Sequence, residues 1–242
     1  MIIAEIGLNH LGYIELVNDY LDICLHADVD GITFQIREEE FYKNNSNLIL
    51  SDSEYKKIAK TIQSKNKKFG VAIADINKID FLESIDTDFY KVIRNDITNK
   101  NLMKKLISTG KQIIVSTGLS TDKDIKNFIN EFATKNITLN HTQLSYDVND
   151  CNLLAIQTMR EKYDCNISFG SHCDNLNVLY MSLCYNPSSI LFYVKADSFG
   201  IEFPDDKHAI FTKNIKTVVK NLKSLRTAVG SGIKQKIKNK IG

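Results

Sequence analysis

Residues 1–36 read MIIAEIGLNHLGYIELVNDYLDICLHADVDGITFQI, and this stretch decides the fold. An apolar run at 1–7 is followed by an amphipathic run at 13–27 and a second apolar run at 30–36. Short runs rich in Ile, Val and Phe predict buried strands, and apolar residues three and four positions apart predict a helix. The stretch therefore predicts a strand, a helix and a second strand, the repeating unit of α/β proteins.

The same alternation continues along the chain. Further strands are expected at 68–74, 88–94, 112–117, 137–142, 166–170 and 189–195. Further helices are expected at 52–65, 77–85, 99–109, 121–135, 150–163, 174–185 and 212–228. Eight strand–helix pairs in 242 residues match the count and length of a single (β/α)8 TIM barrel. We place this barrel at 1–230 and a basic C-terminal tail at 231–242.

Three features refine this expectation. A doubly wound open sheet has less support, because no GxGxxG motif follows the first strand. Segments 37–50 and 197–211 are expected to be long loops, which often carry function. Ser51 and Asp174 stand where helices are expected to begin and could cap them.

Composition limits the class of partner. The chain has 31 basic and 29 acidic residues, so neither nucleic acid nor a membrane surface is expected as the main partner. No apolar run approaches the roughly 20 residues of a membrane span. Glu5 and His10 interrupt what would be the apolar part of a signal peptide. Five cysteines without a CxxC pair favour a reduced, cytoplasmic protein.

Polar residues gather at the C-terminal ends of the expected strands. The alternation around strand 30–36 separates two faces. The apolar face, expected to pack on the helices, carries Ile32, Phe34 and Ile36. The polar face, expected to point toward the barrel interior or its mouth, carries Thr33, Gln35 and Arg37. The inward faces of the first and fourth strands carry Glu5 and Lys91. Barrel enzymes place their chemistry at this end of the strands, so we expect the active site there.

The candidate residues at this end combine cations, amides, hydroxyls, carboxylates and imidazoles. Lysine and arginine with hydroxyls and amides suit a small phosphorylated or carboxylated substrate, whereas carboxylates and imidazoles can hold a divalent metal or move protons. The candidates are Glu5, Asn9, His10, Gln35, Arg37, Asp75, Lys91, Arg94, Asn95, Asp96, Ser116, Thr117, His141, Thr142, Gln143, Ser171, His172, Asp174, Lys195, Asp197, Asp205, Asp206, Lys207 and His208.

Several short motifs among these residues match one family in order and spacing. They are AEIGLNHLG at 4–12, FQ at 34–35, YKV at 90–92, STG at 116–118, SHCD at 171–174 and PDDKHA at 204–209. In these motifs the chain resembles the sialic acid (N-acetylneuraminate) synthase family. The resemblance implies a (β/α)8 barrel that condenses phosphoenolpyruvate with an N-acylated amino sugar, usually with Mn²⁺ or Mg²⁺. The implied products are inorganic phosphate and a 2-keto-3-deoxy sugar acid, which would be used to build surface carbohydrates.

The resemblance also implies roles for individual residues. Glu5, Lys91 and Asp96 are the implied catalytic residues, and His172 is the implied metal ligand. Lys91 also matches a phosphoenolpyruvate-binding lysine, and Asp205 matches an acid that contacts the sugar. The residues expected to bind substrates are Asn9, His10, Gln35, Arg37, Arg94, Ser116, Thr117, Gln143, Lys195, Asp205 and Lys207.

The chain departs from the family pattern at defined positions. Thr33 replaces a lysine, Arg94 replaces a serine, and the second metal histidine has become Val194 or Lys195. Arg37, Arg94 and Lys195 could restore positive charge for an anionic substrate. The sequence also lacks the C-terminal antifreeze-like domain through which family members partly dimerise, so a homodimer stays open.

Two other functions stay open at this point. Lys91 or Lys195 could form a Schiff base with a keto acid, as in an aldolase or lyase. The third hypothesis is a non-catalytic barrel that binds a sugar. Structural explanations also exist for single residues: Glu5 could simply pair with Lys91, and His141 and His208 are as readily structural as functional.

Overall fold

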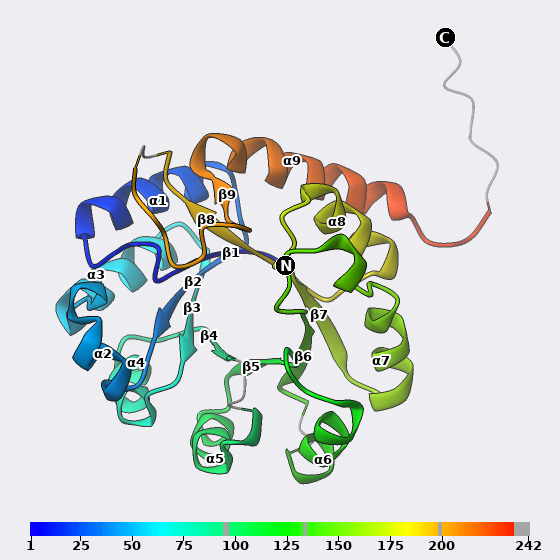
Figure 1. Ribbon diagram of the computed structural model, residues 1–242, viewed down its shortest axis with the longest axis horizontal. Coiled ribbons are helices and arrows are strands. Elements are labelled where there is room, and N and C mark those ends of the chain that lie inside the picture. The colour runs from blue at the N-terminus through cyan, green and yellow to red at the C-terminus, as the bar shows by residue number, and fades with distance from the viewer. Residues whose placement is uncertain (94–96, 133–134, 198–199, 235–242) are drawn as a thin grey trace.

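The computed structural model describes residues 1–93, 97–132, 135–197 and 200–234, and a closed ring of parallel strands forms its centre (Figure 1). The strands are β1 (Ile2–Gly7), β2 (Gly31–Ile36), β3 (Lys68–Ile73), β4 (Phe89–Val92), β5 (Gln112–Ser116), β6 (Ile137–His141), β7 (Asn166–Gly170) and β8 (Ile190–Lys195). Each strand pairs with the next along the chain, and β8 pairs with β1, which closes the ring. The expected single (β/α)8 barrel is thereby confirmed, whereas the division of the chain at residue 230 stays a prediction.

Helices surround the ring, as Figure 1 shows. They are α1 (Ile14–His26), α2 (Glu39–Asn44), α3 (Asp52–Gln63), α4 (Ile79–Ser84), α5 (Lys100–Ser108), α6 (Asp122–Phe132), α7 (Ala155–Tyr163), α8 (Leu176–Met181) and α9 (Thr212–Val229). Short 3₁₀ turns add η1 (Ser46–Leu48), η2 (Ile76–Lys78), η4 (Val148–Asp150) and η5 (Ser182–Tyr185). The start of α3 is set by a capping box, because Ser51 and Glu54 each accept the other's backbone N–H.

The structure corrects four sequence expectations. The segment 37–50 is not only a loop, because it folds into α2 and η1. The segment 197–211 ends in a short strand, β9 (Ile210–Phe211), which pairs with β8. The helix expected from residue 150 begins only at Ala155, after the separate turn η4. The cap of α8 is Asn175 rather than Asp174, since the Asn175 side chain accepts the Asn177 N–H.

Two apolar layers hold the barrel together. The larger lies between strands and helices and includes Ile32, Phe34 and Ile36 of β2, as their alternation predicts. The smaller fills the interior of the ring with side chains from β1, β4, β5 and β8, namely Ile3, Phe89, Ile114 and Leu191. Because this floor closes the ring on one side, the polar residues farther along the same strands face a cavity open at the other side.

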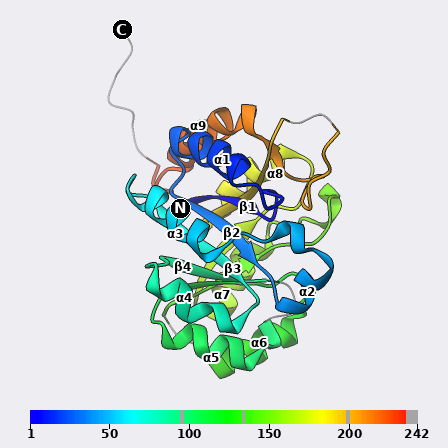
Figure 2. The ribbon, with the colours of Figure 1, turned by 90° about the vertical axis from the view of Figure 1, so that its left-hand side faces the viewer.

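The last helix completes the outer layer. The helix α9 contacts α1 and lies beside it in both Figure 1 and Figure 2, next to the strand pair β8 and β1. Its buried face carries Ile215, Val218, Val219 and Leu222. Among the described residues, no helix is both long enough and apolar enough to cross a membrane.

Gly70 tests how tightly the floor is packed. A Cβ at this position would lie 2.3 Å from Cζ of Phe89, which is far closer than two carbons can approach. We therefore expect Gly70→Ala to lower the free energy of unfolding by about 1–3 kcal/mol, measured by urea denaturation. The double variant Gly70→Ala/Phe89→Leu should recover part of the loss, and a Gly70→Ala variant as stable as the parent would contradict this packing.

Candidate active site

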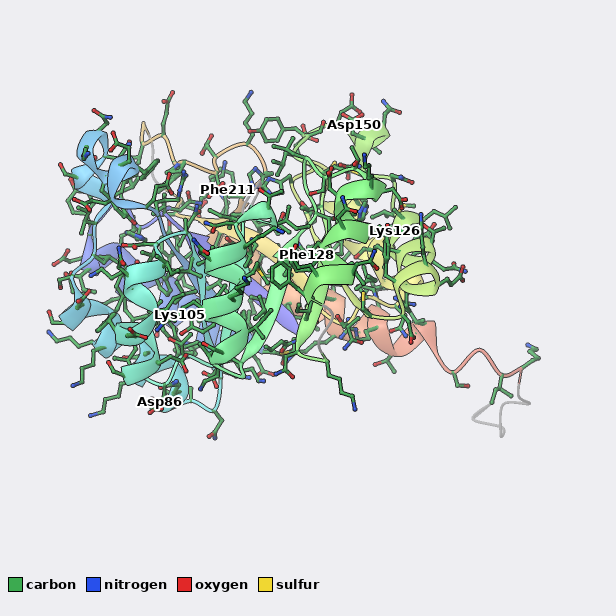
Figure 3. All side chains as sticks on the ribbon, turned by 90° about the horizontal axis from the view of Figure 1, so that it is seen from below. Asp86, Lys105, Lys126, Phe128, Asp150 and Phe211 are labelled. Atoms are coloured by element: carbon green, nitrogen blue, oxygen red, sulfur yellow. The ribbon has the colours of Figure 1, made fainter. Side chains whose placement is uncertain are left out.

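A cavity of about 280 Å³ opens at the C-terminal ends of the strands. It is lined by Gln35, Lys91, Ile93, Ser116, Asn140, Thr142, Leu144, Tyr146, Gly170, His172, Tyr193, Pro204, Asp205 and His208. In Figure 3, Asp150 from the loop after β6 and Asp86 from the turn before β4 lie at opposite ends of the barrel. The cavity belongs to the Asp150 end, which is the end where barrel enzymes hold their active sites.

An ion pair between Glu5 of β1 and Lys91 of β4 lies at the base of this cavity. The Lys91 ammonium donates to Oε2 of Glu5, and the two side chains are only 6% and 1% exposed. The second oxygen, Oε1, is buried without a hydrogen-bond partner. A buried ion pair with an unused acceptor is costly to fold, because both charges have lost their hydration, so a functional role is expected for it.

Tyr193 extends this pair toward the cavity wall. Lys91 Nζ also donates to the Tyr193 hydroxyl at 3.3 Å, and the Tyr193 hydroxyl lies 3.5 Å from Nε2 of His172. Tyr193 stands on β8 directly opposite Glu5 in the strand register. A continuous polar chain thus runs from a carboxylate through an ammonium and a phenol on the ring strands to the imidazole of His172 in the loop after β7.

The wall formed by β5, β6 and β7 is polar and closely packed. Ser116 and Thr142 face the cavity and are buried, and Oγ1 of Thr142 has no partner. Asn140 accepts a hydrogen bond from Ser168 at 2.9 Å, and a Cβ on Gly170 would lie 2.6 Å from its amide nitrogen. Small residues here let an amide and two hydroxyls reach the cavity, which suits an oxygen-rich anion.

The loops after β6 and β8 form an aromatic wall opposite. The His208 ring packs on Tyr146 at 5.7 Å and on His172 at 4.4 Å between ring centroids, and meets Tyr193 edge-on. The Asp205 carboxylate lies 3.8 Å from Nε2 of His208. Aromatic faces beside a carboxylate are suited to the mixed apolar and hydroxyl surface of a sugar.

His208 combines burial with unused polar atoms. Both of its ring nitrogens are buried and lack hydrogen-bond partners. Desolvation, reinforced by the charges of Lys91 and Lys195, lowers its pKa to about 4, so the ring is neutral at pH 7. Such a ring presents one N–H donor and one acceptor beside the cavity.

Asn9 is a brace between loops. Its amide nitrogen donates to the Val194 carbonyl at 2.8 Å, and its amide oxygen accepts the Asp205 N–H at 3.1 Å. Its backbone carbonyl accepts from the Tyr20 hydroxyl, which in turn accepts the Ala196 N–H. All these bonds are internal, so Asn9 positions the loop that bears Asp205 rather than lining the cavity.

His10 also lies away from the cavity. Its Nδ1 accepts the Gly12 N–H at 2.9 Å and its ring packs against Phe34, so it holds the first loop in its turn. Nε2 is buried without a partner, and desolvation lowers the His10 pKa to about 4. The sequence motif that contains Asn9 and His10 therefore folds the loop around the site.

Five other candidates stand outside the cavity lining. Thr117 donates to the Asn140 carbonyl at 3.0 Å, and Gln143 is exposed to solvent. Arg37 forms a two-point ion pair with Glu38. Lys195 donates to the carbonyl and carboxylate of Asp206, and exposed Lys207 lies over the Tyr146 ring.

The other residues with an expected catalytic, metal-binding or substrate-binding role fall into two groups. Gln35, Lys91, Ser116, His172 and Asp205 line the cavity together, and Glu5 joins them through Lys91. Arg94 and Asp96 lie outside the described residues, so their expected roles stay predictions.

A divalent metal does not fit the donors that the structure brings together. Among residues 1–93, 97–132, 135–197 and 200–234, no three His, Cys, Asp or Glu side chains form a group that could hold a metal ion. His172 lies next to the Tyr193 hydroxyl and His208, and the two strand lysines add positive charge nearby. Of the two strand-8 residues that could stand at the second histidine's position, Val194 is buried in the core and Lys195 donates to Asp206.

Sequence reasoning gave too little weight to two residues. Tyr193 could have been found, because it shares the inward face of β8 with Leu191 and Lys195. His208 lies in a loop without periodicity, so only the folded chain shows that it reaches the cavity.

Comparisons with known proteins agree with this architecture. The sequence profile of the NeuB family matches residues 22–234. The N,N'-diacetyllegionaminic acid synthase of Campylobacter jejuni is 22% identical over 99% of this chain and 80% of its own length. The N-acetylneuraminate-9-phosphate synthase of Drosophila melanogaster is 23% identical over 74% of this chain and 55% of its own length.

A solved structure shows the same fold. The N-acetylneuraminic acid (sialic acid) synthetase of Leptospira borgpetersenii, crystallised with citrate, superposes with a TM-score of 0.88 at 24% identity. The match covers 97% of this chain and 86% of that one.

The Glu5–Lys91 pair predicts a large and specific stability effect. Lys91→Met leaves a buried carboxylate unpaired, so the free energy of unfolding should fall by about 3–5 kcal/mol in urea denaturation. The double variant Glu5→Gln/Lys91→Met should lose less, because no charge is left behind. As a control, Lys43→Met removes one partner of the exposed ion pair with Glu40 and should cost less than about 1 kcal/mol. Equal losses for the Lys91 and Lys43 variants would contradict the buried pair.

The buried His10 ring predicts a pH dependence of stability. Its pKa is 6.5 when unfolded and about 4 when folded, so below pH 6.5 the unfolded chain takes up a proton that the folded chain does not. Stability should therefore fall as the pH drops from about 6.5 toward 4. In His10→Asn, which can still accept the Gly12 N–H, the loss between pH 7 and pH 5 should be smaller by about 2 kcal/mol. Identical pH profiles for the two proteins would show that His10 is not held neutral.

Proposed function

Because this chain belongs to the NeuB family, we propose that it condenses phosphoenolpyruvate with the aldehyde of an N-acyl sugar. The products would be a 2-keto-3-deoxy sugar acid and inorganic phosphate, for surface carbohydrate biosynthesis in the cytoplasm. Sugar acid synthases among its relatives support this class of reaction.

The observation that carries the proposal is the buried Lys91 ammonium at the base of a polar cavity. Lys91 is 5% exposed and reaches the cavity with Ser116 and Thr142 on neighbouring strands. A cation, two hydroxyls and an amide within one rigid ring of strands can bind the charges of phosphoenolpyruvate with little reorganisation. We therefore assign the β4–β6 side of the cavity to phosphoenolpyruvate.

The opposite side is assigned to the sugar. Tyr146 and His208 supply aromatic faces, and Asp205 supplies a carboxylate that can accept sugar hydroxyls. A Cβ on Gly7 would lie 3.3 Å from Oδ2 of Asp205, so the C-terminal end of β1 packs directly against this carboxylate. Two substrates on opposite walls would meet near the centre, in front of Lys91 and Tyr193.

The reaction then follows from the chemistry of an enol phosphate. C3 of phosphoenolpyruvate forms the new bond to the aldehyde carbon, which leaves positive charge at C2. Water adds to C2, and loss of phosphate from the resulting hemiketal gives the keto group. In this scheme the Glu5 carboxylate, with one unused oxygen beside Lys91, favours the developing positive charge and can accept a proton from the water.

The Schiff-base alternative has less structural support. Lys91 donates to Glu5 and Tyr193, and Lys195 donates to Asp206, so both amines are held as ion-pair donors. A Schiff base needs a free nitrogen lone pair. Borohydride treatment with pyruvate should therefore leave both lysines unmodified, and a reduced adduct on either one would favour the aldolase reading.

The proposed reaction is tested by phosphate release from phosphoenolpyruvate with a panel of N-acyl sugars, and by mass spectrometry of the product. Release should require a sugar. Ser116→Ala should raise the KM for phosphoenolpyruvate roughly 10-fold or more, because a hydrogen bond to a charged substrate is lost. Ser108→Ala removes a similar hydroxyl at the end of α5 and should leave the KM unchanged. No release with any sugar would contradict the proposal and leave the sugar-binding reading.

A further inference from the structure

A second cavity, of about 350 Å³, lies at the opposite end of the barrel from the candidate active site. It opens where β7 and β8 begin and where α7 and α9 end, which is the Asp86 end of the molecule in Figure 3. Two half-buried arginines line it, Arg160 from the last turn of α7 and Arg226 from the last turn of α9. The proposed reaction uses neither of them.

The two guanidinium groups are held by one short backbone segment. Nη2 of Arg160 donates to the carbonyls of Tyr185 at 2.7 Å and Asn186 at 2.8 Å. Nη2 of Arg226 donates to the next carbonyl, that of Pro187, at 3.0 Å. Within the part of the chain that the structure describes, Nε and Nη1 of both arginines have no hydrogen-bond partner. Each group is therefore fixed through one nitrogen and keeps further N–H donors for a ligand.

The charges of these arginines are not balanced by a carboxylate. Among the described residues, no Asp or Glu lines this cavity, and neither arginine takes part in an ion pair. Asp164, just after α7, lines the adjoining cavity that shares Arg160. The other polar side chains of this cavity are neutral, namely Asn166, Asn186 and Ser188. Two cations that line one cavity repel each other, so both favour an anion bound there.

We propose that this cavity binds a phosphate group, carried either by inorganic phosphate or by a small phosphate monoester. The planar fork of a guanidinium pairs with two phosphate oxygens at once, which the ammonium of a lysine does not do. The chain has only four arginines among its 31 basic residues, and two of the four line this cavity. A phosphate monoester carries about two negative charges at pH 7, so it can neutralise both arginines, whereas a single carboxylate can neutralise one.

The test follows the Nε–Hε signals of the arginine side chains by nuclear magnetic resonance, with the ¹⁵N-labelled protein. Arg160→Gln and Arg226→Gln assign the two signals, because each variant removes one of them. When inorganic phosphate is added at constant ionic strength, both signals should shift and saturate along one binding curve. The Arg37 signal should not follow that curve, because its fork is already paired with Glu38.

Variants then show whether the two arginines act together. Arg226→Gln should raise the phosphate Kd read from the Arg160 signal by roughly 10-fold or more, because a hydrogen bond to a charged ligand is lost. Lys162→Gln is the matched control, since Lys162 also lies in the last turn of α7 but pairs with Asp122 and does not line the cavity. It should leave this Kd within about twofold.

A parallel titration with glycerol 3-phosphate distinguishes the two sources of the phosphate group. Tighter binding of the ester would identify an organic phosphate as the ligand, and tighter binding of the free ion would identify inorganic phosphate; either result supports the site. Shifts of Arg160 and Arg226 that grow without saturation and match that of Arg37 would overturn the inference. An unchanged Kd in Arg226→Gln would also overturn it. Because no turnover is measured, neither result bears on the proposed function.

Discussion

The ion pair between Glu5 and Lys91 is the interaction on which the site depends. It joins β1 to β4 across the interior of the barrel, directly above the apolar floor of Ile3, Phe89, Ile114 and Leu191. Burying two charges in this position costs hydration that a pair of apolar residues would not lose. The pair places a fixed cation at the base of the cavity, and in the proposed function that cation binds the substrate anion.

The rest of the structure holds this centre in place. The floor beneath it is packed so closely that Gly70 leaves no room for a methyl group against Phe89. Above it, Asn9 ties the first loop to β8 and to the loop that carries Asp205. These contacts are internal hydrogen bonds and packing, so the functional side chains are presented by a rigid frame, as an electrostatic site requires.

Much of the fold and part of the site could be predicted from the sequence. The eight strands and the inward faces of β1, β2 and β4 follow from alternation, so Glu5, Gln35 and Lys91 were expected where they stand. The roles of Asn9 and Thr117 could not be predicted from the sequence. Their hydrogen-bond partners lie 185 and 23 residues away along the chain and come into reach only in the folded barrel. His208 carries no periodic signal, and its contacts with Tyr146, His172 and Tyr193 exist only once three loops meet.

The central claim is that the β4–β6 side of the cavity binds phosphoenolpyruvate through Lys91. A crystal structure of the protein with phosphoenolpyruvate tests this most directly. The account predicts an oxygen of the ligand within hydrogen-bond distance of Lys91 Nζ and of the Ser116 hydroxyl, with Tyr193 facing the open side of the ligand. Phosphoenolpyruvate bound elsewhere, or an empty cavity at saturating concentration, would contradict it.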